Sequence, residues 1–174
     1  TEILDLASIE SGRISLTAEP FALNELVEDC VCAARLLPWT ERNAITITAE
    51  YPEGVSSFVC ADQTRTRQIL HNLVTNAVKY NKLGGQVLVR VARMAETGMV
   101  RVTVQDNGLG IPAHLRGELF QPFSRLGREA GDVEGTGIGL SICRRLAGDM
   151  GGSLDYTSIE GEGSDFWIEF PMCA

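Results

Sequence analysis

The amino-acid sequence predicts a two-layer α/β sandwich in which helices cover one face of a mixed β-sheet. Two patterns carry this prediction. Several segments place apolar residues at the spacing of one helix face, and two pairs of β-rich runs are joined by short turns typical of hairpins. Helices that alternate with antiparallel hairpins along a chain are expected to form one helical layer packed on one sheet.

The helical segments are bounded by residues that favour helix ends. Pro38 follows the first long apolar-periodic segment and disfavours helical backbone at the residue before it. Asp62 can cap the second segment, because its side chain can accept a hydrogen bond from a backbone N–H of the first turn. One glycine ends the N-terminal segment, and a pair of glycines ends the last one. The predicted helices span residues 1–11, 22–37, 62–80 and 140–150.

The predicted strands are short and rich in β-favouring residues. Three of them are single runs, at residues 13–16, 45–49 and 57–60. The other four form two hairpins, which pair residues 86–92 with 99–105 and residues 154–158 with 165–170. The first hairpin turns around Thr97-Gly98.

Composition indicates one globular domain and excludes several classes of protein. The chain has 174 residues, with 15 Lys and Arg against 23 Asp and Glu, so its formal net charge is −8. This acidity argues against a general nucleic-acid-binding protein, and no apolar run approaches the ~18 residues of a membrane span. The N-terminus has no signal peptide and no starting Met. We therefore expect a piece of a longer protein with a cytoplasmic location.

The cysteine pattern argues against structural use of sulfur. The chain has five cysteines and two histidines, and no cysteine pair has the CxxC spacing of many zinc and redox sites. We therefore expect reduced thiols, without a disulfide framework or a zinc site. Cys30 and Cys32 are two residues apart on a predicted helix, so they should point to different faces.

The helix predicted over residues 62–80 carries a polar stripe opposite its apolar face. Arg65, Asn72, Asn76 and Lys79 fall within roughly 60° of arc at helical spacing. An amide oxygen is a hard, neutral ligand that suits Mg²⁺, and a lysine one turn further on can meet a phosphate. A solvated polar face would give the same pattern, and the helix alone does not decide between the two interpretations.

Two glycine-containing segments lie between the hairpins. Residues 106–112 (DNGLGIP) directly follow a predicted strand, and Asp106 can accept a hydrogen bond from an amino group there. Residues 126–139 form a long loop ending in GTGIG before a helix, where backbone N–H groups can meet an anion. The two phenylalanines of residues 120–125 can anchor this loop, and the arginine can face a phosphate. The glycine spacing is not GxGxxG and no lysine follows a glycine, which excludes Rossmann and Walker A motifs.

Together these segments resemble the catalytic, ATP-binding domain of bacterial sensor histidine kinases, in the superfamily that also holds type II topoisomerases, a mismatch-repair factor and a heat-shock chaperone. Five boxes of that family occur in order, which is more specific than any one of them. They resemble the N box at 71–81 (HNLVTNAVKYN), the G1 box at 106–112, the F box at 120–125, the G2 box at 135–140 (GTGIGL) and the last glycine box at 161–166 (GEGSDF). The resemblance covers about residues 12–171. It implies a Bergerat ATP-binding fold, with a five-stranded mixed sheet backed by three helices.

The resemblance also implies roles for single residues, with ATP and Mg²⁺ as the ligands. Asn72 and Asn76 would hold Mg²⁺, and Lys79 and Arg125 would act with them on the phosphates as catalytic residues. Asp106 would accept a hydrogen bond from the adenine amino group. The other implied nucleotide-binding positions are Tyr80, Gly108, Gly110 and Ile111 around base and ribose, Gly135, Thr136, Gly137, Ile138, Gly139 and Leu140 in the lid, and Ser164 near the adenine through water.

One position favours phosphoryl transfer to a protein over hydrolysis. Members of the superfamily that hydrolyse ATP carry Glu at the place of Asn72, and an amide cannot serve as a general base. A protein-histidine kinase is therefore the preferred interpretation. Two alternatives remain open at this point: a nucleotide-binding regulatory module, either a pseudokinase or an anti-sigma-like kinase, and an interaction domain that binds no nucleotide.

The phosphoacceptor of such a kinase is expected outside this sequence. The family's acceptor histidine is usually followed by an acidic residue, whereas an asparagine follows His71 and a leucine follows His114. We expect residues 1–12 to be the end of the second dimerisation helix and residues 13–174 to be the catalytic domain. The implied partners are the protein's own dimerisation domain, with a homodimeric full-length protein, and a downstream response regulator, but no nucleic acid.

Overall fold

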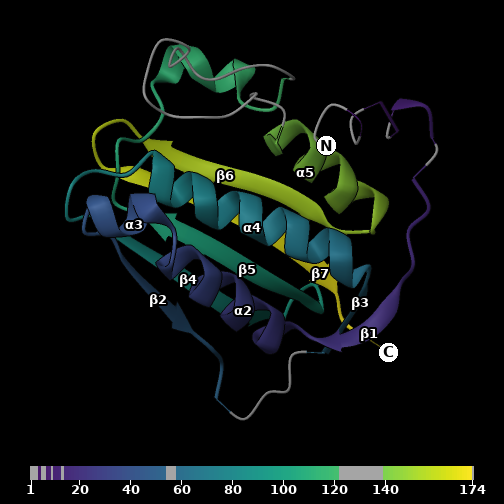
Figure 1. Cartoon of the computed structure of the whole chain (residues 1–174). Coiled ribbons are helices and arrows are strands. Elements are labelled where there is room, and N and C mark those ends of the chain that lie inside the picture. The colour runs from purple at the N-terminus through teal and green to yellow at the C-terminus, as the bar shows by residue number, and fades with distance from the viewer. Residues whose placement is uncertain are drawn as a thin grey trace.

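The predicted two-layer architecture is confirmed. The computed structural model describes residues 14–53, 58–121 and 139–173, together with residues 4, 7, 8 and 10–12. A five-stranded sheet forms one layer (Figure 1). The helices on one of its faces are α2 (Leu23–Arg35), α4 (Gln63–Lys79) and α5 (Gly139–Asp149).

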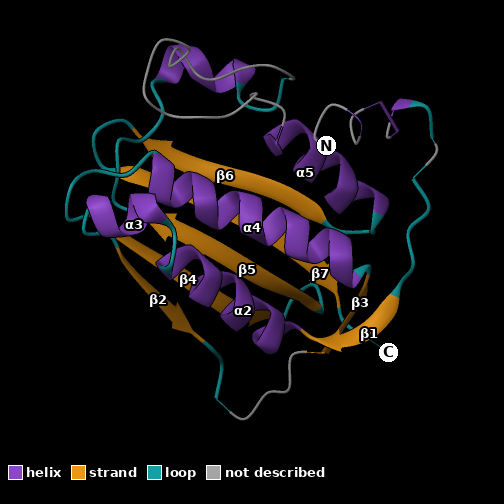
Figure 2. Cartoon of the chain, viewed as in Figure 1, coloured by secondary structure: helices purple, strands orange, loops and turns teal. Residues whose placement is uncertain are grey.

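The large sheet is mixed, and both predicted hairpins are present in it. Its strand order is β2 (Thr46–Glu50), β4 (Gln86–Met94), β5 (Met99–Asp106), β7 (Gly163–Pro171) and β6 (Ser153–Ile159) (Figure 2). The β2–β4 pair is parallel and the three other pairs are antiparallel. The register of β5 against β7 places Asp106 opposite Ser164. Two residues from distant boxes therefore meet at one end of the sheet.

A second, two-stranded sheet corrects one prediction. It pairs β1 (Glu19–Ala22) with β3 (Phe58–Ala61), so the strand predicted at residues 13–16 is wrong. Ile14 and Leu16 do pack against the core, which explains their alternating pattern. They form no strand because regular β-structure also requires a partner ladder, and β3 lies beside residues 19–22 instead.

Two short helical elements were not predicted. The helix α3 (Pro38–Arg42) begins at the proline that ends the previous helical pattern, because proline is well suited to the first turn of a helix. A 3₁₀ helix, η1 (Ala113–Glu118), follows the G1 segment.

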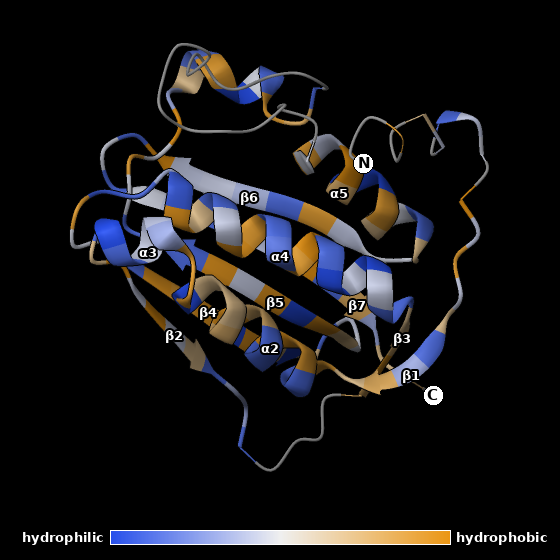
Figure 3. Cartoon of the chain, viewed as in Figure 1, coloured by the Kyte–Doolittle hydropathy of each residue, from blue (hydrophilic) through white to orange (hydrophobic). Residues whose placement is uncertain are grey.

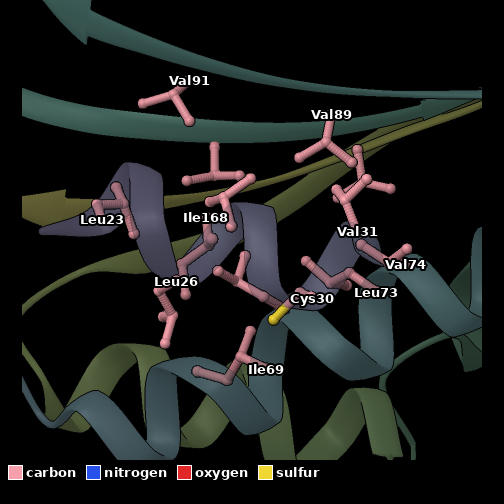
Figure 4. Packing of buried hydrophobic residues seen from close by; sticks show 14 of the residues in the cluster. Leu23, Leu26, Cys30, Val31, Ile69, Leu73, Val74, Val89, Val91 and Ile168 are labelled. Atoms are coloured by element: carbon pink, nitrogen blue, oxygen red, sulfur yellow. The ribbon is translucent and has the colours of Figure 1, made fainter. Parts of the chain in front are cut away.

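The core lies between the helical layer and the sheet. Hydrophobic and hydrophilic residues alternate along the strands and around the helices (Figure 3), and the apolar sides meet in one cluster. Figure 4 shows its centre, where side chains of α2, α4, β4 and β7 face one another. Those labelled are Leu23, Leu26, Cys30, Val31, Ile69, Leu73, Val74, Val89, Val91 and Ile168. This packing fixes one face of α4 against the sheet and leaves its polar stripe to face elsewhere.

The predicted cap of α4 is confirmed. Asp62 Oδ1 accepts a hydrogen bond from the backbone N of Arg65 at 3.0 Å, and its Oδ2 accepts one from the backbone N of Thr17 at 2.9 Å. Burial raises the pKa of Asp62, but these backbone N–H donors outweigh it, so the net pKa lies below its ordinary value. The cap also ties the segment before β1 to the start of α4.

The expectation that all cysteines are reduced is wrong. Cys60 and Cys173 form a disulfide, with Cα atoms 5.1 Å apart and a sequence separation of 113 residues. The pairing arises because the end of β7 runs beside β3, where Val59 bridges Met172. Spacing along the chain gives no sign of that contact. The prediction for the helical pair is confirmed, since Cys30 is buried and Cys32 is exposed, and burial raises the pKa of the Cys30 thiol to about 11.

The N-terminal segment ends where predicted. Residues 4, 7, 8 and 10 have helical backbone, and Gly12 follows with a φ of 67°. The assignment of this segment to a dimerisation helix stays a prediction. Within the described ranges, no helix has the length and apolar character needed to cross a membrane.

Candidate functional site

A pocket opens where the C-terminal half of α4 meets the ends of β5 and β7 and the start of α5. Its space, including the open mouth, is about 490 Å³. Seven residues singled out from the sequence line it: Asn76, Tyr80, Asp106, Gly110, Ile111, Leu140 and Ser164. The structure therefore brings together residues from the N box, the G1 box, the G2 box and the last glycine box.

One end of this pocket, here named the acid end, consists of Asp106, Gly110, Ile111 and Ser164. The Asp106 carboxylate is oriented by the turn that follows it, because its Oδ1 accepts a hydrogen bond from the backbone N of Gly108 at 2.9 Å. The backbone N of Ile111 donates to the hydroxyl of Ser158 at 2.8 Å, which fixes the far side of the same loop. The carboxylate is thus held on a loop whose two sides are both hydrogen-bonded.

Two glycines allow this loop to pack closely on its neighbours. Gly110 has a φ of 65°, and a Cβ there would lie 2.1 Å from the carbonyl oxygen of Ile159. A Cβ on Gly108 would lie 2.6 Å from the carbonyl oxygen of Tyr80. The loop is therefore held between the β6–β7 hairpin and the end of α4, at distances that a side chain would prevent.

A second group of residues, here named the amide end, consists of Asn76 and Leu140, which line the pocket, and of Asn72 and Gly139 beside them. The side-chain nitrogen of Asn76 donates to Asn72 Oδ1 at 3.2 Å, so the i, i+4 amides predicted to share a face do interact. A Cβ on Gly139 would lie 2.2 Å from Asn72 Nδ2, so the missing side chain lets α5 begin against this amide. The first backbone N–H groups of a helix lack intrahelical partners and carry partial positive charge. The amide end thus joins amide side chains to a helix N-terminus.

Lys79 and Tyr80 lie where the helix ends. Both are half-buried, and Tyr80 lines the pocket as the C-terminal cap residue of α4. The carbonyl oxygen of Tyr80 accepts a hydrogen bond from the backbone N of Leu109 at 3.2 Å, which joins α4 to the G1 loop. Arg125, Gly135, Thr136, Gly137 and Ile138 lie outside the described residues, so their assigned roles stay predictions.

The segment after η1 is anchored by an aromatic contact. The Phe120 ring meets the Tyr156 ring edge-on, with centroids 5.8 Å apart, and the Arg144 guanidinium lies 4.2 Å from the Phe120 centroid. Tyr156 in turn stacks on Phe166, which lines the pocket. Phe120 is therefore held by neighbouring side chains, whereas Phe123 and most of the loop that the two rings are predicted to anchor lie outside the described residues.

Four lining residues were not identified as site residues from the sequence: Leu73, Ala77, Leu119 and Phe166. Leu73 and Ala77 were assigned to the apolar face of α4, and they do belong to the buried core. Phe166 is two residues after Ser164 on β7, so the alternation of a strand would have placed both on one face. No local pattern indicated Leu119 or the hydroxyl of Ser158.

Comparisons with known proteins show the family of this chain. The family described as "Histidine kinase-, DNA gyrase B-, and HSP90-like ATPase" matches residues 61–174. Sensor protein GacS of Pseudomonas syringae pv. syringae is 36% identical over 178 residues, covering 98% of this chain. The chain spans 19% of the length of GacS, so it matches about a fifth of that protein.

Solved structures give the same result. Full-length ShkA in complex with AMPPNP superposes with a TM-score of 0.85 at 29% identity, covering 99% of this chain and 35% of ShkA. The nucleotide-free catalytic domain of histidine kinase ThkA gives 0.73 at 31% identity, covering 91% of this chain and 96% of that domain. ThkA has also been solved in complex with the response regulator TrrA, with a TM-score of 0.74 at 28% identity over 98% of this chain and 47% of that one. The chain therefore belongs to the histidine kinase-, DNA gyrase B- and HSP90-like ATPase family, as an ATP-binding domain of the sensor histidine kinase type.

Proposed function

We propose that this domain binds ATP with Mg²⁺ and presents the γ-phosphoryl group to a histidine on an upstream dimerisation helix of a longer protein. The observation that carries the proposal is that Asp106 and Asn76 line one pocket, although they come from different boxes and different layers. A carboxylate at one end suits an amino group, and amides beside a helix N-terminus suit a metal-bound phosphate chain.

The acid end is proposed as the base-binding part. Asp106 accepts a hydrogen bond from the adenine amino group, and the backbone around Gly110 and Ile111 lies along the ring. The tight contacts of Gly108 and Gly110 support this role, since they hold the loop in place before any ligand arrives. Tyr80 lines the pocket at the end of α4 and contacts ribose or base.

The amide end is proposed as the part that faces phosphates and metal. Asn76 and Asn72 offer neutral oxygen ligands of the kind Mg²⁺ accepts, so the side chains present fit that ion. When bound, Mg²⁺ neutralises phosphate charge during transfer. Lys79, Arg125 and the backbone N–H groups at 135–140 bind the remaining phosphate oxygens. Local positive charge of this kind explains how a protein with a net charge of −8 binds an anion.

Transfer to a protein is favoured over hydrolysis. The residue packed against the start of α5 is the amide of Asn72, which has no basicity with which to activate water. The domain's contribution is to position the phosphate chain and to balance its charge. By analogy with ThkA, which has been solved with a response regulator, we propose that a response regulator is the downstream partner.

A nucleotide titration tests the binding half of the proposal. Asp106→Asn keeps an oxygen for the backbone N of Gly108 but places an NH₂ group where an acceptor is needed. We expect ATP affinity to fall about 10- to 150-fold, since a buried hydrogen bond to a charged group is lost. Isothermal titration calorimetry of both forms with ATP and Mg²⁺ measures this. Unchanged affinity would refute the adenine assignment.

Two further measurements separate the alternatives. Binding of ATP should raise the melting temperature in a Mg²⁺-dependent way. At an ATP concentration of 100 times the Kd, the free energy of unfolding should increase by about 2.7 kcal/mol. An interaction domain that binds no nucleotide would show no rise. In the full-length protein with labelled ATP, a histidine kinase should form acid-labile phosphate. Acid-stable phosphate on a partner would indicate an anti-sigma-like kinase, and binding without transfer would indicate a pseudokinase.

A further inference from the structure

The hydroxyl of Ser158 occupies a junction that the proposed function does not use. Ser158 lies on β6 and its side chain is buried. Its Oγ lies 2.8 Å from the backbone N of Ile111, 3.1 Å from the carbonyl oxygen of Gly163 and 2.8 Å from Ser164 Oγ. One small side chain on β6 thus contacts both the start of β7 and the loop that follows β5.

The two backbone contacts of Ser158 favour one arrangement of the hydroxyl protons. A backbone N–H can only donate and a carbonyl oxygen can only accept, so Ser158 receives from Ile111 and donates its single proton to Gly163. The third contact is then a hydrogen bond only if Ser164 donates its own proton to Ser158. Buried polar groups are rarely left without partners. An arrangement in which Ser164 donates to Ser158 is therefore favoured over one in which Ser158 donates to Ser164 and no longer to the Gly163 carbonyl.

Ser164 links Ser158 to the pocket, because it contacts Ser158 and also lines the pocket. In this arrangement the Ser164 proton is directed at Ser158, so the hydroxyl presents only lone pairs to the pocket that Ser164 lines. Its cross-strand partner is Asp106, whose carboxylate also only accepts. Two neighbouring acceptors match a group with two N–H donors, such as the exocyclic amine of adenine. They disfavour the carbonyl oxygen that a 6-oxopurine carries at the same position.

We infer that Ser158 is a positioning residue that sets selectivity for 6-aminopurine over 6-oxopurine nucleotides, by holding the Ser164 hydroxyl as an acceptor. The inference rests on the proposed function, because it concerns the base of the same nucleotide. Arg116 supports it: its guanidinium donates to the carbonyl oxygens of both Ser158 and Ile111. These contacts hold the backbone of the junction independently of the Ser158 hydroxyl.

The test is a comparison of two nucleotides on matched variants. Isothermal titration calorimetry of this chain with ATP and with inosine triphosphate, both with Mg²⁺, gives the ratio of their affinities. In Ser158→Ala the Ser164 proton is released, so we expect the preference for ATP to fall about 3- to 10-fold, the equivalent of one hydrogen bond. Ser158→Thr keeps a hydroxyl and should restore the preference. Ser153→Ala, an exposed serine on the same strand, should leave it unchanged.

A double variant tests whether Ser158 acts through Ser164. If it does, Ser158→Ala should change the nucleotide preference in the original chain but add nothing in a Ser164→Ala background. An equal loss of affinity for both nucleotides, or an additive effect in the double variant, would mean a purely structural role and would overturn the inference. If Ser158→Ala does not fold, Ser164→Ala alone must still lower the preference, and an unchanged ratio there overturns the inference. Failure of the original chain to bind ATP would refute the proposed function itself, which is a distinguishable result.

Discussion

The acid end of the pocket is held by backbone contacts between distant strands, whereas the amide end is held by side chains on one helix. At the acid end, Gly110 touches the carbonyl of Ile159, and the hydroxyl of Ser158 joins the loop to β7. At the amide end, Asn72 and Asn76 hydrogen-bond to each other one turn apart. The first end therefore depends on tertiary packing, and the second depends on the continuity of α4.

The difference separates two requirements of the ligand. A flat base with fixed donors and acceptors needs partners whose positions do not change, and burial among backbone groups provides this at the acid end. A hydrated metal ion and a phosphate chain need charge and ligands of less strict geometry, and half-buried side chains on a helix suit them.

Reduction of the disulfide should lower stability without changing the pocket. Ser164 lies near the start of β7 and Cys173 follows its end, so the cross-link lies away from the acid end of the site. Because it closes a long loop, its loss should lower the free energy of unfolding by about 4–5 kcal/mol. Urea unfolding with and without dithiothreitol measures this, and a Cys60→Ala/Cys173→Ala variant should not respond to the reductant. A large loss of ATP affinity in the folded, reduced protein would contradict the separation.

A side chain at Gly110 should damage the acid end far more than the same change in an open turn. Gly98 has nearly the same φ, 67° against 65°, but a Cβ there meets nothing within 4 Å. Gly98→Ala should therefore cost only the left-handed conformation, about 1–2 kcal/mol. Gly110→Ala should cost about 1–3 kcal/mol more, because the Ile159 backbone must move. Equal urea midpoints for the two variants would show that the acid end is not held tightly.

Removal of one amide should weaken binding only when the metal is present. Asn76→Ala takes away a proposed Mg²⁺ ligand and should lower ATP affinity about fivefold with Mg²⁺, the equivalent of about 1 kcal/mol. With a chelator present, the variant and the original chain should bind alike. Calorimetry under both conditions checks this, with Thr64→Ala as an exposed control on the same helix. A loss of equal size without metal would place Asn76 among the phosphate or base contacts instead.

The cap of α4 should stabilise the protein at neutral pH and lose this contribution at acid pH. The folded-state pKa of Asp62 is below its ordinary value of 3.8. Its contribution is therefore complete above that value and is lost as the pH falls through the lower, folded-state pKa. Asp62→Ala should destabilise the protein by about 1 kcal/mol at neutral pH. Asp62→Asn keeps an acceptor oxygen but does not titrate. When the pH is lowered from about 5 to about 2, the urea midpoint of this variant should therefore fall less than that of the original chain. Identical pH profiles for the two would contradict the charged cap.

Much of the amide end could be predicted from the sequence. The spacing of Asn72 and Asn76 on a helix that begins after Asp62 predicted both the shared face and the cap, and the structure has both. The hairpins were also predicted, because alternation and turn residues are local signals. By contrast, the strand predicted at residues 13–16 was wrong, since a pattern of alternating burial does not supply a neighbouring strand.

Local sequence encodes the long helices, the hairpins and the polar stripe of α4, because each follows from side chains only a few positions apart. The tertiary structure alone decided that Asp106 stands opposite Ser164, that Ser158 reaches the loop of Ile111, and that Cys60 meets Cys173. These contacts join residues from separate elements, and strand order and register, which no short segment encodes, select them. The acid end and its inferred base selectivity belong to this second group.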